Sequence, residues 1–213
     1  MATLCVFGFA AVGLITKLMF IWHPKMDEFQ FLGLRAIVHL FISMILLNRK
    51  IKELAYDCIT KNQFINLLSV SLQVFFAFYC SVQALEALPL VEYALVLNTV
   101  PIFVAIFGYF TLGHKLDVYD LILLLFSFIG VFILMIFNDS EESMHQTDIS
   151  YHEGMFLLFV TTILLSYSCI TMRKMKALNS KVPTFYIGLF GAIFFNACGA
   201  FTGSGLELFK ILT

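Results

Sequence analysis

Two side chains that can carry positive charge lie close together inside an apolar stretch of the sequence. Arg35 and His39, in "FLGLRAIVHL", are four residues apart, a spacing that places both on one face of a helix. Lys17 lies near the end of the preceding apolar stretch. A cation in lipid needs water, a partner or an anionic ligand, unless its long side chain reaches the membrane surface. Arg35 and His39 are therefore candidate substrate-binding residues, and with Lys17 they favour an anionic solute.

A later apolar stretch carries uncharged polar groups at helical spacing. Asn66, Ser69, Gln73 and Cys80 follow one another by three, four and seven residues, so they share one face of a helix. Such groups either bind a neighbouring helix through hydrogen bonds or line a wet cavity. We take Gln73 and Asn66 as candidate solute contacts, and Tyr79 as a candidate aromatic wall.

The next apolar stretch includes an acid, an amide and a proline. Glu92 and Tyr93 lie near its start, where an acid also suits the positive end of the helix dipole. Asn98 lies deeper, close to Pro101, which removes a backbone hydrogen bond and kinks a helix. A kink beside an amide suits a moving or ligand-contacting helix, although plain packing also tolerates it. Glu92 is a candidate proton-linked group, Tyr93 a second aromatic wall and Asn98 a polar group of the cavity.

The other reactive residue types form no catalytic or metal-binding motif. No two of the five cysteines lie within four residues of each other, which excludes zinc-site spacing and a C-x-x-C redox pair. The sequence has no G-x-S-x-G motif and no phosphate-binding loop. Its net charge of −1 gives no argument for nucleic acid as a partner. We therefore expect no enzyme activity, no metal and no cofactor.

The elements that must position these residues are membrane helices. Of the 213 residues, 61% are hydrophobic and 13% are charged, against about a quarter charged in soluble domains. A spanning helix needs roughly 20 mostly apolar residues. Seven segments meet this length, some loosely: about 3–21, 29–47, 64–84, 90–112, 118–137, 154–172 and 184–203. We expect an all-α polytopic membrane protein with short polar connectors.

Lysines and arginines are concentrated in alternate connectors. The second connector holds Arg49, Lys50, Lys52 and Lys61, the fourth holds Lys115, and the sixth holds Arg173, Lys174, Lys176 and Lys181. The odd-numbered connectors hold only Lys25. Cytoplasmic loops carry such an excess. We therefore expect a cytosolic amino terminus and an acidic loop at 138–153 that faces the lumen or the outside. Plasma membrane and endomembrane both fit.

Several short motifs follow one another between Ala84 and Met135. They are Ala84-Leu85, Leu88-Pro89, Pro101-Ile102-Phe103, Leu112-Gly113 and Gly130-Val131. With "FLGLRAIVHL" around Arg35, they resemble the EamA-type domain of the drug/metabolite transporter superfamily. Members typically have Leu-Gly-Glu where His114 follows Gly113 here, so no role for that acid is carried over. Among eukaryotic relatives the sequence is similar to solute carrier family 35, in particular its G-type branch.

The resemblance implies a fold of ten helices, arranged as two inverted five-helix repeats around a substrate cavity. Residues 1–137 would form one complete EamA-type unit, 138–153 a connecting loop, and 154–213 the start of an inverted second unit. That second unit stops after about two helices. The chain is thus expected to be a fragment, a truncated product or a degenerate relative of a ten-helix carrier. If it ends at Thr213, a homodimer or a partner subunit is expected to complete it.

The function that these observations favour is transmembrane transport. A small organic solute would bind near the midplane and cross by alternating access, coupled to exchange or to protons. The solute and the lipid bilayer are the expected partners. The alternative is a non-transporting membrane protein that regulates or scaffolds a partner. A membrane-embedded enzyme has the least support.

Overall fold

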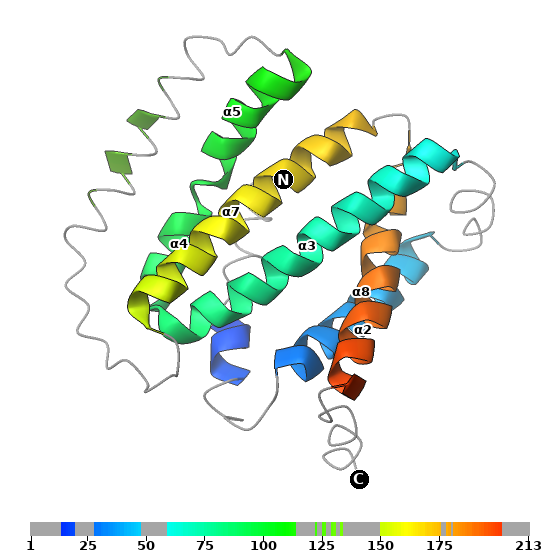
Figure 1. Ribbon diagram of the computed structural model, residues 1–213, viewed down its shortest axis with the longest axis horizontal. Coiled ribbons are helices and arrows are strands. Elements are labelled where there is room, and N and C mark those ends of the chain that lie inside the picture. Colours follow the sequence, from blue (N-terminus) through cyan, green and yellow to red (C-terminus); the bar gives the residue numbers. More distant parts are fainter. Residues whose placement is uncertain are drawn as a thin grey trace. The chain divides into compact units, whose positions relative to one another are not determined.

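The computed structural model is built of α-helices, with no strand in the part of the chain that it describes. That part comprises residues 14–19, 28–47, 59–113, 150–175, 178–179 and 181–201, together with 122, 125–126, 129–130 and 133. The helices are α2 (Glu28–Leu47), α3 (Lys61–Ala87), α4 (Leu90–Leu97), α5 (Val100–Leu112), α7 (Tyr151–Lys174) and α8 (Lys181–Phe201) (Figure 1). Residues 14–19 are also helical. The expected all-α class is confirmed for these residues.

Five stretches of the described chain are long and apolar enough to cross a membrane. They are Glu28–Leu47, Lys61–Ala87, Leu90–Thr111, Tyr151–Lys174 and Lys181–Phe201. Each overlaps a segment that the sequence predicts. The other two predicted segments, 3–21 and 118–137, lie mostly outside the described residues. The five helices make the chain an integral, multi-pass membrane protein.

A break divides the helix that the sequence predicts at 90–112. α4 ends at Leu97, with Asn98 as its C-cap, and Thr99 is the N-cap of α5. Pro101, in the first turn of α5, has no N–H to donate to the Leu97 carbonyl, so the helical bond that would continue α4 cannot form. The Thr99 hydroxyl instead donates to the Val96 carbonyl at 2.6 Å. This bond satisfies one carbonyl of the last turn of α4.

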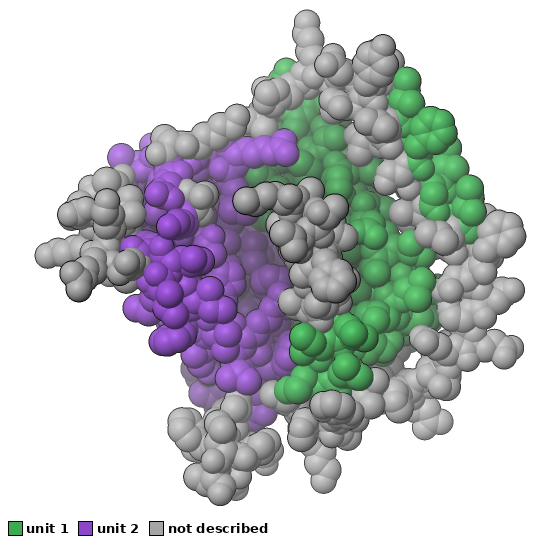
Figure 2. Space-filling view, turned by 180° about the vertical axis from the view of Figure 1, so that it is seen from behind, with its two compact units in different colours: residues 1–24, 80–170 green, residues 25–79, 171–213 purple. Residues whose placement is uncertain are grey.

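The chain folds into two compact units, each made of segments that are distant in the sequence (Figure 2). Unit 1 comprises Met1–Pro24 and Cys80–Ile170. Unit 2 comprises Lys25–Tyr79 and Thr171–Thr213. Unit 1 therefore contains α4, α5, the end of α3 and most of α7. Unit 2 contains α2, α8 and the longer part of α3.

Small residues let α2 and α8 pack closely in unit 2. A Cβ added at Gly188 would lie 3.0 Å from backbone atoms of Leu40, and one added at Gly191 would lie 3.3 Å from the Cβ of Ala36. Such close approach of backbones is characteristic of membrane helix pairs. The buried apolar cluster beside this contact consists of Leu47, Leu67, Val70, Val74, Met175, Val182, Phe185 and Tyr186. Packing of α3 against α8 thus completes the core of unit 2.

The end of α3, α4 and the start of α7 form the core of unit 1. Its buried members are Ala84, Leu85, Leu88, Tyr93, Val96 and Leu158. Gly154 allows α7 to reach this cluster, because an added Cβ would lie 2.7 Å from the Cβ of Ala87. The hydroxyls of Thr161 and Thr162 are buried in α7 and donate to carbonyls one turn earlier, at 2.9 Å each. Their polarity is therefore satisfied within the helix.

Candidate functional site

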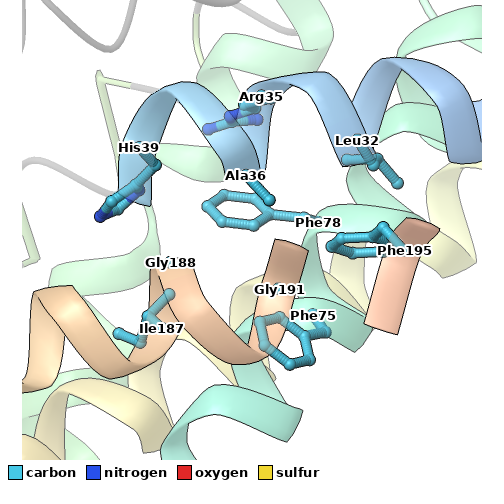
Figure 3. Close-up of a pocket in the computed structure, with 10 residues that line it drawn as sticks. All are labelled: Leu32, Arg35, Ala36, His39, Phe75, Phe78, Ile187, Gly188, Gly191 and Phe195. Carbon is cyan, nitrogen blue, oxygen red and sulfur yellow. The ribbon is translucent and has the colours of Figure 1, made fainter. Parts of the chain in front are cut away.

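Unit 2 contains a small recess lined by three helices. The lining residues are Leu32, Arg35, Ala36 and His39 of α2, Phe75 and Phe78 of α3, and Ile187, Gly188, Gly191 and Phe195 of α8 (Figure 3). Its volume is about 20 Å³, which accommodates about one water molecule. The recess is mainly apolar, so the two nitrogen-bearing side chains determine what it can bind.

Arg35 lies over an aromatic ring at this recess. Its guanidinium carbon is 4.1 Å from the centroid of Phe78, and Figure 3 shows the Phe78 ring below the guanidinium. At this distance a cation–π interaction contributes roughly 0.5–2 kcal/mol. The interaction orients the guanidinium and leaves its positive charge in place.

His39 is fixed by a contact with α8. Its ring is hydrogen-bonded to the backbone of Thr184. The Nε2 atom of the same ring is buried and has no hydrogen-bond partner among the described residues. A buried polar atom without a partner costs about 1–3 kcal/mol. Water or a ligand group in the recess would remove this cost.

The walls of the recess are held by packing between aromatic residues. Phe75 stacks on Phe194, with ring centroids 5.8 Å apart, and meets Phe195 edge to face at 5.5 Å. Gly188 and Gly191 line the recess where α8 packs closely against α2. The recess thus lies between aromatic walls beside the contact of α2 with α8.

The other candidate residues of unit 2 have separate surroundings. Gln73 donates from Nε2 to the Ser69 hydroxyl at 2.9 Å, and its Oε1 is buried without a partner in the described part of the chain. Tyr79 stacks on Phe29, with centroids 5.4 Å apart. Asn66 is exposed on α3. None of these three candidates is among the lining residues of the recess.

A second group of polar residues lies in unit 1, where α3 meets α4. Glu92 accepts a hydrogen bond from the Tyr151 hydroxyl at 2.9 Å. The hydroxyl of Tyr93 is hydrogen-bonded to that of Ser81. The Lys17 ammonium donates to the Leu88 carbonyl at 3.0 Å, at the end of α3, where a cation suits the negative end of the helix dipole. Glu92 and Tyr93 therefore connect neighbouring helices in this unit.

Asn98 lies at the break between α4 and α5, also in unit 1. Its side chain is exposed. On the other side of the break, the Ser166 hydroxyl of α7 lies 3.2 Å from the Val100 carbonyl and 2.6 Å from the Thr162 carbonyl. A polar group of α7 thus contacts the interrupted backbone.

The structure brings Arg35 and His39 to one recess, with residues that the sequence analysis did not select. Phe78, one of 25 phenylalanines, had no local signal that could identify it. Gly188 and Gly191 did have one, because residues three positions apart share one face of a helix and small residues are enriched where membrane helices pack. Tyr151 and Ser166 were also missed. Lys17 belongs to unit 1, whereas Arg35 and His39 belong to unit 2.

A metal site has no counterpart in the described residues, where no group of three His, Cys, Asp or Glu side chains is suitably placed.

The sequence was matched to a known protein family. The model of the EamA-like transporter family matches residues 1–136. A search of curated proteins gives no match.

Proposed function

Because the chain belongs to the EamA-like transporter family, we propose that it moves a small organic solute across the membrane by alternating access. The family match over residues 1–136 carries this proposal. Five helices that can span a membrane support it. The recess in unit 2 adds support, because small molecules bind in concave, largely apolar sites with a few polar groups.

The recess is the first place at which we expect the solute to bind. Arg35 supplies a fixed positive charge, and the buried Nε2 of His39 supplies an unused hydrogen-bonding atom. The further contacts that we propose are Gln73, Tyr79 and Asn66 in unit 2, and Glu92, Tyr93 and Asn98 in unit 1. Gln73 has the strongest case among these, because its buried Oε1 also has no partner in the described residues.

The pairing of α2 with α8 supports the proposal of an inverted repeat. "FLGLRA" at 31–36 is similar to "YIGLFG" at 186–191, so Gly33 corresponds to Gly188 and Ala36 to Gly191. A Cβ added at Gly33 would lie 3.2 Å from Asn196, and one at Gly188 would lie 3.0 Å from Leu40. Gly33 thus meets α8 at a residue eight positions after Gly188, and Gly188 meets α2 at a residue seven positions after Gly33. Helices related by a two-fold axis pack in this way.

We therefore propose residues 1–137 as a first EamA-type unit and 154–213 as the start of an inverted second unit. The similarity to solute carrier family 35 belongs to the same proposal. It predicts organic metabolites, rather than inorganic ions, as solutes.

Counterflow in proteoliposomes tests the transport function. Vesicles that contain the full chain and an unlabelled solute are placed in labelled solute, for a panel of organic acids, sugars, amino acids and nucleotide sugars. We expect accelerated uptake of at least one class. We expect Arg35→Gln to reduce that uptake about tenfold, as the loss of a charge-assisted contact would.

Lys181→Gln is the matched control. Lys181 is an exposed cation of the same unit, and its ammonium donates to the Leu46 carbonyl at 3.0 Å. Its removal should leave uptake unchanged. Absence of flux for every class from folded protein, together with a stoichiometric co-purified partner, would instead favour a regulatory or scaffolding role.

A further inference from the structure

One side of α3 carries an exposed cation followed by exposed apolar side chains. This row consists of Lys61, Ile65, Leu68 and Leu72. Its members are spaced by four, three and four residues, so they lie along one side of the helix. The α3 residues in the core of unit 2 lie on the opposite side, and they are Leu67, Val70 and Val74. The Lys61 row therefore faces away from this core.

The Lys61 row matches the depth of one leaflet of a bilayer. Lys61 begins α3, a helix of 27 residues that can span a membrane. Ile65 and Leu72 lie about 6 and 17 Å from it along the axis, at 1.5 Å per residue. A hydrocarbon core is about 30 Å thick, so each leaflet contributes about half of that depth. With Lys61 at the level of the headgroups, the apolar residues of the row lie beside the acyl chains.

The ammonium of Lys61 is not used to hold the fold together. None of the described residues is hydrogen-bonded or ion-paired to it. Lys61 lies in the first turn of α3, at the positive end of the helix dipole, where a cation is unfavourable. Lys181 differs, because its ammonium donates to the Leu46 carbonyl at 3.0 Å, at the negative end of α2. Helix stability therefore accounts for Lys181 but not for Lys61.

Four helix ends meet near Lys61. Leu47 is the last residue of α2, Met175 follows α7, and Val182 lies in the first turn of α8. All three belong to one buried cluster with Leu67 of α3. The end of α7, the start of α8, the end of α2 and the start of α3 are thus neighbours in unit 2.

The charges at this end of unit 2 are of one sign. Arg173 and Lys174 are exposed in the last turn of α7. Glu28 is the one acid among the described residues of unit 2, and it lies at the opposite end of α2, about 30 Å from Leu47 along the axis. In the sequence, the connectors at 48–58 and 176–180 add four basic residues and two acidic ones. An anion at this end therefore meets an excess of positive charge.

We propose that the Lys61 row binds an anionic phospholipid. The headgroup lies at Lys61, and one acyl chain lies along Ile65, Leu68 and Leu72. A zwitterionic phospholipid fits less well, because the described residues at this end offer no acid to its ammonium group. The positive-inside rule also favours cations in cytosolic connectors, but it does not require one to head an exposed apolar row.

The expected orientation of the chain agrees with this proposal. The end that carries Lys61 is the one that we expect to face the cytosol, and the cytosolic leaflet contains the anionic lipids. A lysine close to such a surface raises the affinity about fivefold. The proposal concerns a surface outside the recess and does not depend on the transport function.

Photocrosslinking of the full chain in phosphatidylcholine nanodiscs tests this inference. Phosphatidylserine or phosphatidylcholine with a diazirine on one acyl chain is included as a minor component, and the labelled residues are mapped by mass spectrometry. We expect phosphatidylserine to label residues 64–72 at least about fivefold more than phosphatidylcholine does. Phe201 is 92% exposed at the other end of α8, and both lipids should label it equally.

Three variants show whether the charge of Lys61 is responsible. Lys61→Gln should reduce labelling of residues 64–72 by phosphatidylserine about fivefold and leave labelling by phosphatidylcholine unchanged. Lys61→Arg keeps the charge and should keep the preference. Lys181→Gln removes a neighbouring exposed cation whose ammonium is already bonded to Leu46, so it should also keep the preference.

Several outcomes would overturn the inference. They are equal labelling of residues 64–72 by the two lipids, a preference that survives Lys61→Gln, and an equal loss in Lys181→Gln. Glycerophosphoserine has the same headgroup without acyl chains, so loss of labelling when it is added in excess would indicate a site for a free anion instead. Cross-links between two chains through this row would show that a second copy covers it. Since no readout uses solute flux, the result stands apart from the test of transport.

Discussion

The hydrogen bond from Tyr151 to Glu92 is a direct polar link between α7 and α4. Its length is 2.9 Å, and both side chains are partly buried. Tyr151→Phe removes the donor and keeps the ring. A hydrogen bond to a charged group contributes about 1.5–3 kcal/mol in water-soluble proteins, and polar contacts between membrane helices average about 0.6 kcal/mol. We expect a loss of about 1 kcal/mol in the free energy of unfolding, measured by denaturant titration in micelles.

Tyr109→Phe is the control for this change. Tyr109 is 53% exposed on α5, and it meets Phe110 edge to face through its ring, which the substitution keeps. Substitutions at such positions usually change stability by less than about 0.5 kcal/mol. Equal effects of the two substitutions would show that the Tyr151 hydroxyl contributes no specific stabilisation.

The pairing of Arg35 with His39 could be predicted from sequence, because it is local. Two residues four positions apart on a helix must share a face. Their surroundings could not be predicted, because Phe78 belongs to α3 and Gly188 to α8. Which distant side chain meets which depends on how the helices pack, and no spacing in the sequence encodes it. The same holds for the contact of Tyr151 with Glu92.

At the scale of the helices, the glycines of α8 determine how closely it approaches α2. A Cβ at Gly188 would lie 3.0 Å from the backbone of Leu40, and backbone atoms cannot move aside as a side chain can. We expect Gly188→Ala to separate the helices and to lower the free energy of unfolding by about 1–3 kcal/mol. Thermal unfolding in detergent would measure this loss. The substitution should also weaken solute binding, because the same helices line the recess.

Gly108→Ala tests whether the loss at Gly188 is steric. Gly108 lies within α5, and an added Cβ would meet nothing within 4 Å. Alanine is favoured over glycine in a helix by up to about 1 kcal/mol, so this variant should be as stable as the unchanged protein or more stable. A destabilisation of the same size at both positions would contradict the close-packing explanation.

Helix positions were easier to predict than helix continuity. Apolar length alone places the spans at α2, α3, α7 and α8, because lipid requires a continuous hydrogen-bonded helix. The span at 90–112 was expected to be one kinked helix, and it is two. Pro101 marks the break, but whether a proline bends or interrupts a helix depends on what satisfies the freed carbonyls. Here Thr99 and Ser166 bond to carbonyls on either side of the break, and only the structure identifies Ser166.

At the scale of the whole molecule, the charge pattern predicts which helix ends face the cytosol. α7 has 24 residues, a length of about 36 Å that exceeds the hydrocarbon thickness of about 30 Å. Its two ends should therefore emerge on opposite sides of the membrane. Arg173 and Lys174 lie in its last turn, and Glu153 lies in its first. By the positive-inside rule, we expect the end at Lys174 to be cytosolic.

Labelling of single cysteines tests this orientation. In a chain whose five native cysteines are replaced by alanine, His152→Cys and Lys174→Cys mark the two ends of α7, where both native side chains are exposed. After selective permeabilisation of the plasma membrane, an impermeant maleimide should label Lys174→Cys. For a protein of an organelle membrane, His152→Cys should react only when all membranes are opened. For a protein of the plasma membrane, His152→Cys should instead react in intact cells.

A cysteine at Lys181 is the control for the same end of α7. Lys181 begins α8 and lies seven positions after Lys174, so Lys181→Cys should behave like Lys174→Cys. The reversed pattern would mean that the loop charges do not set the orientation of this chain.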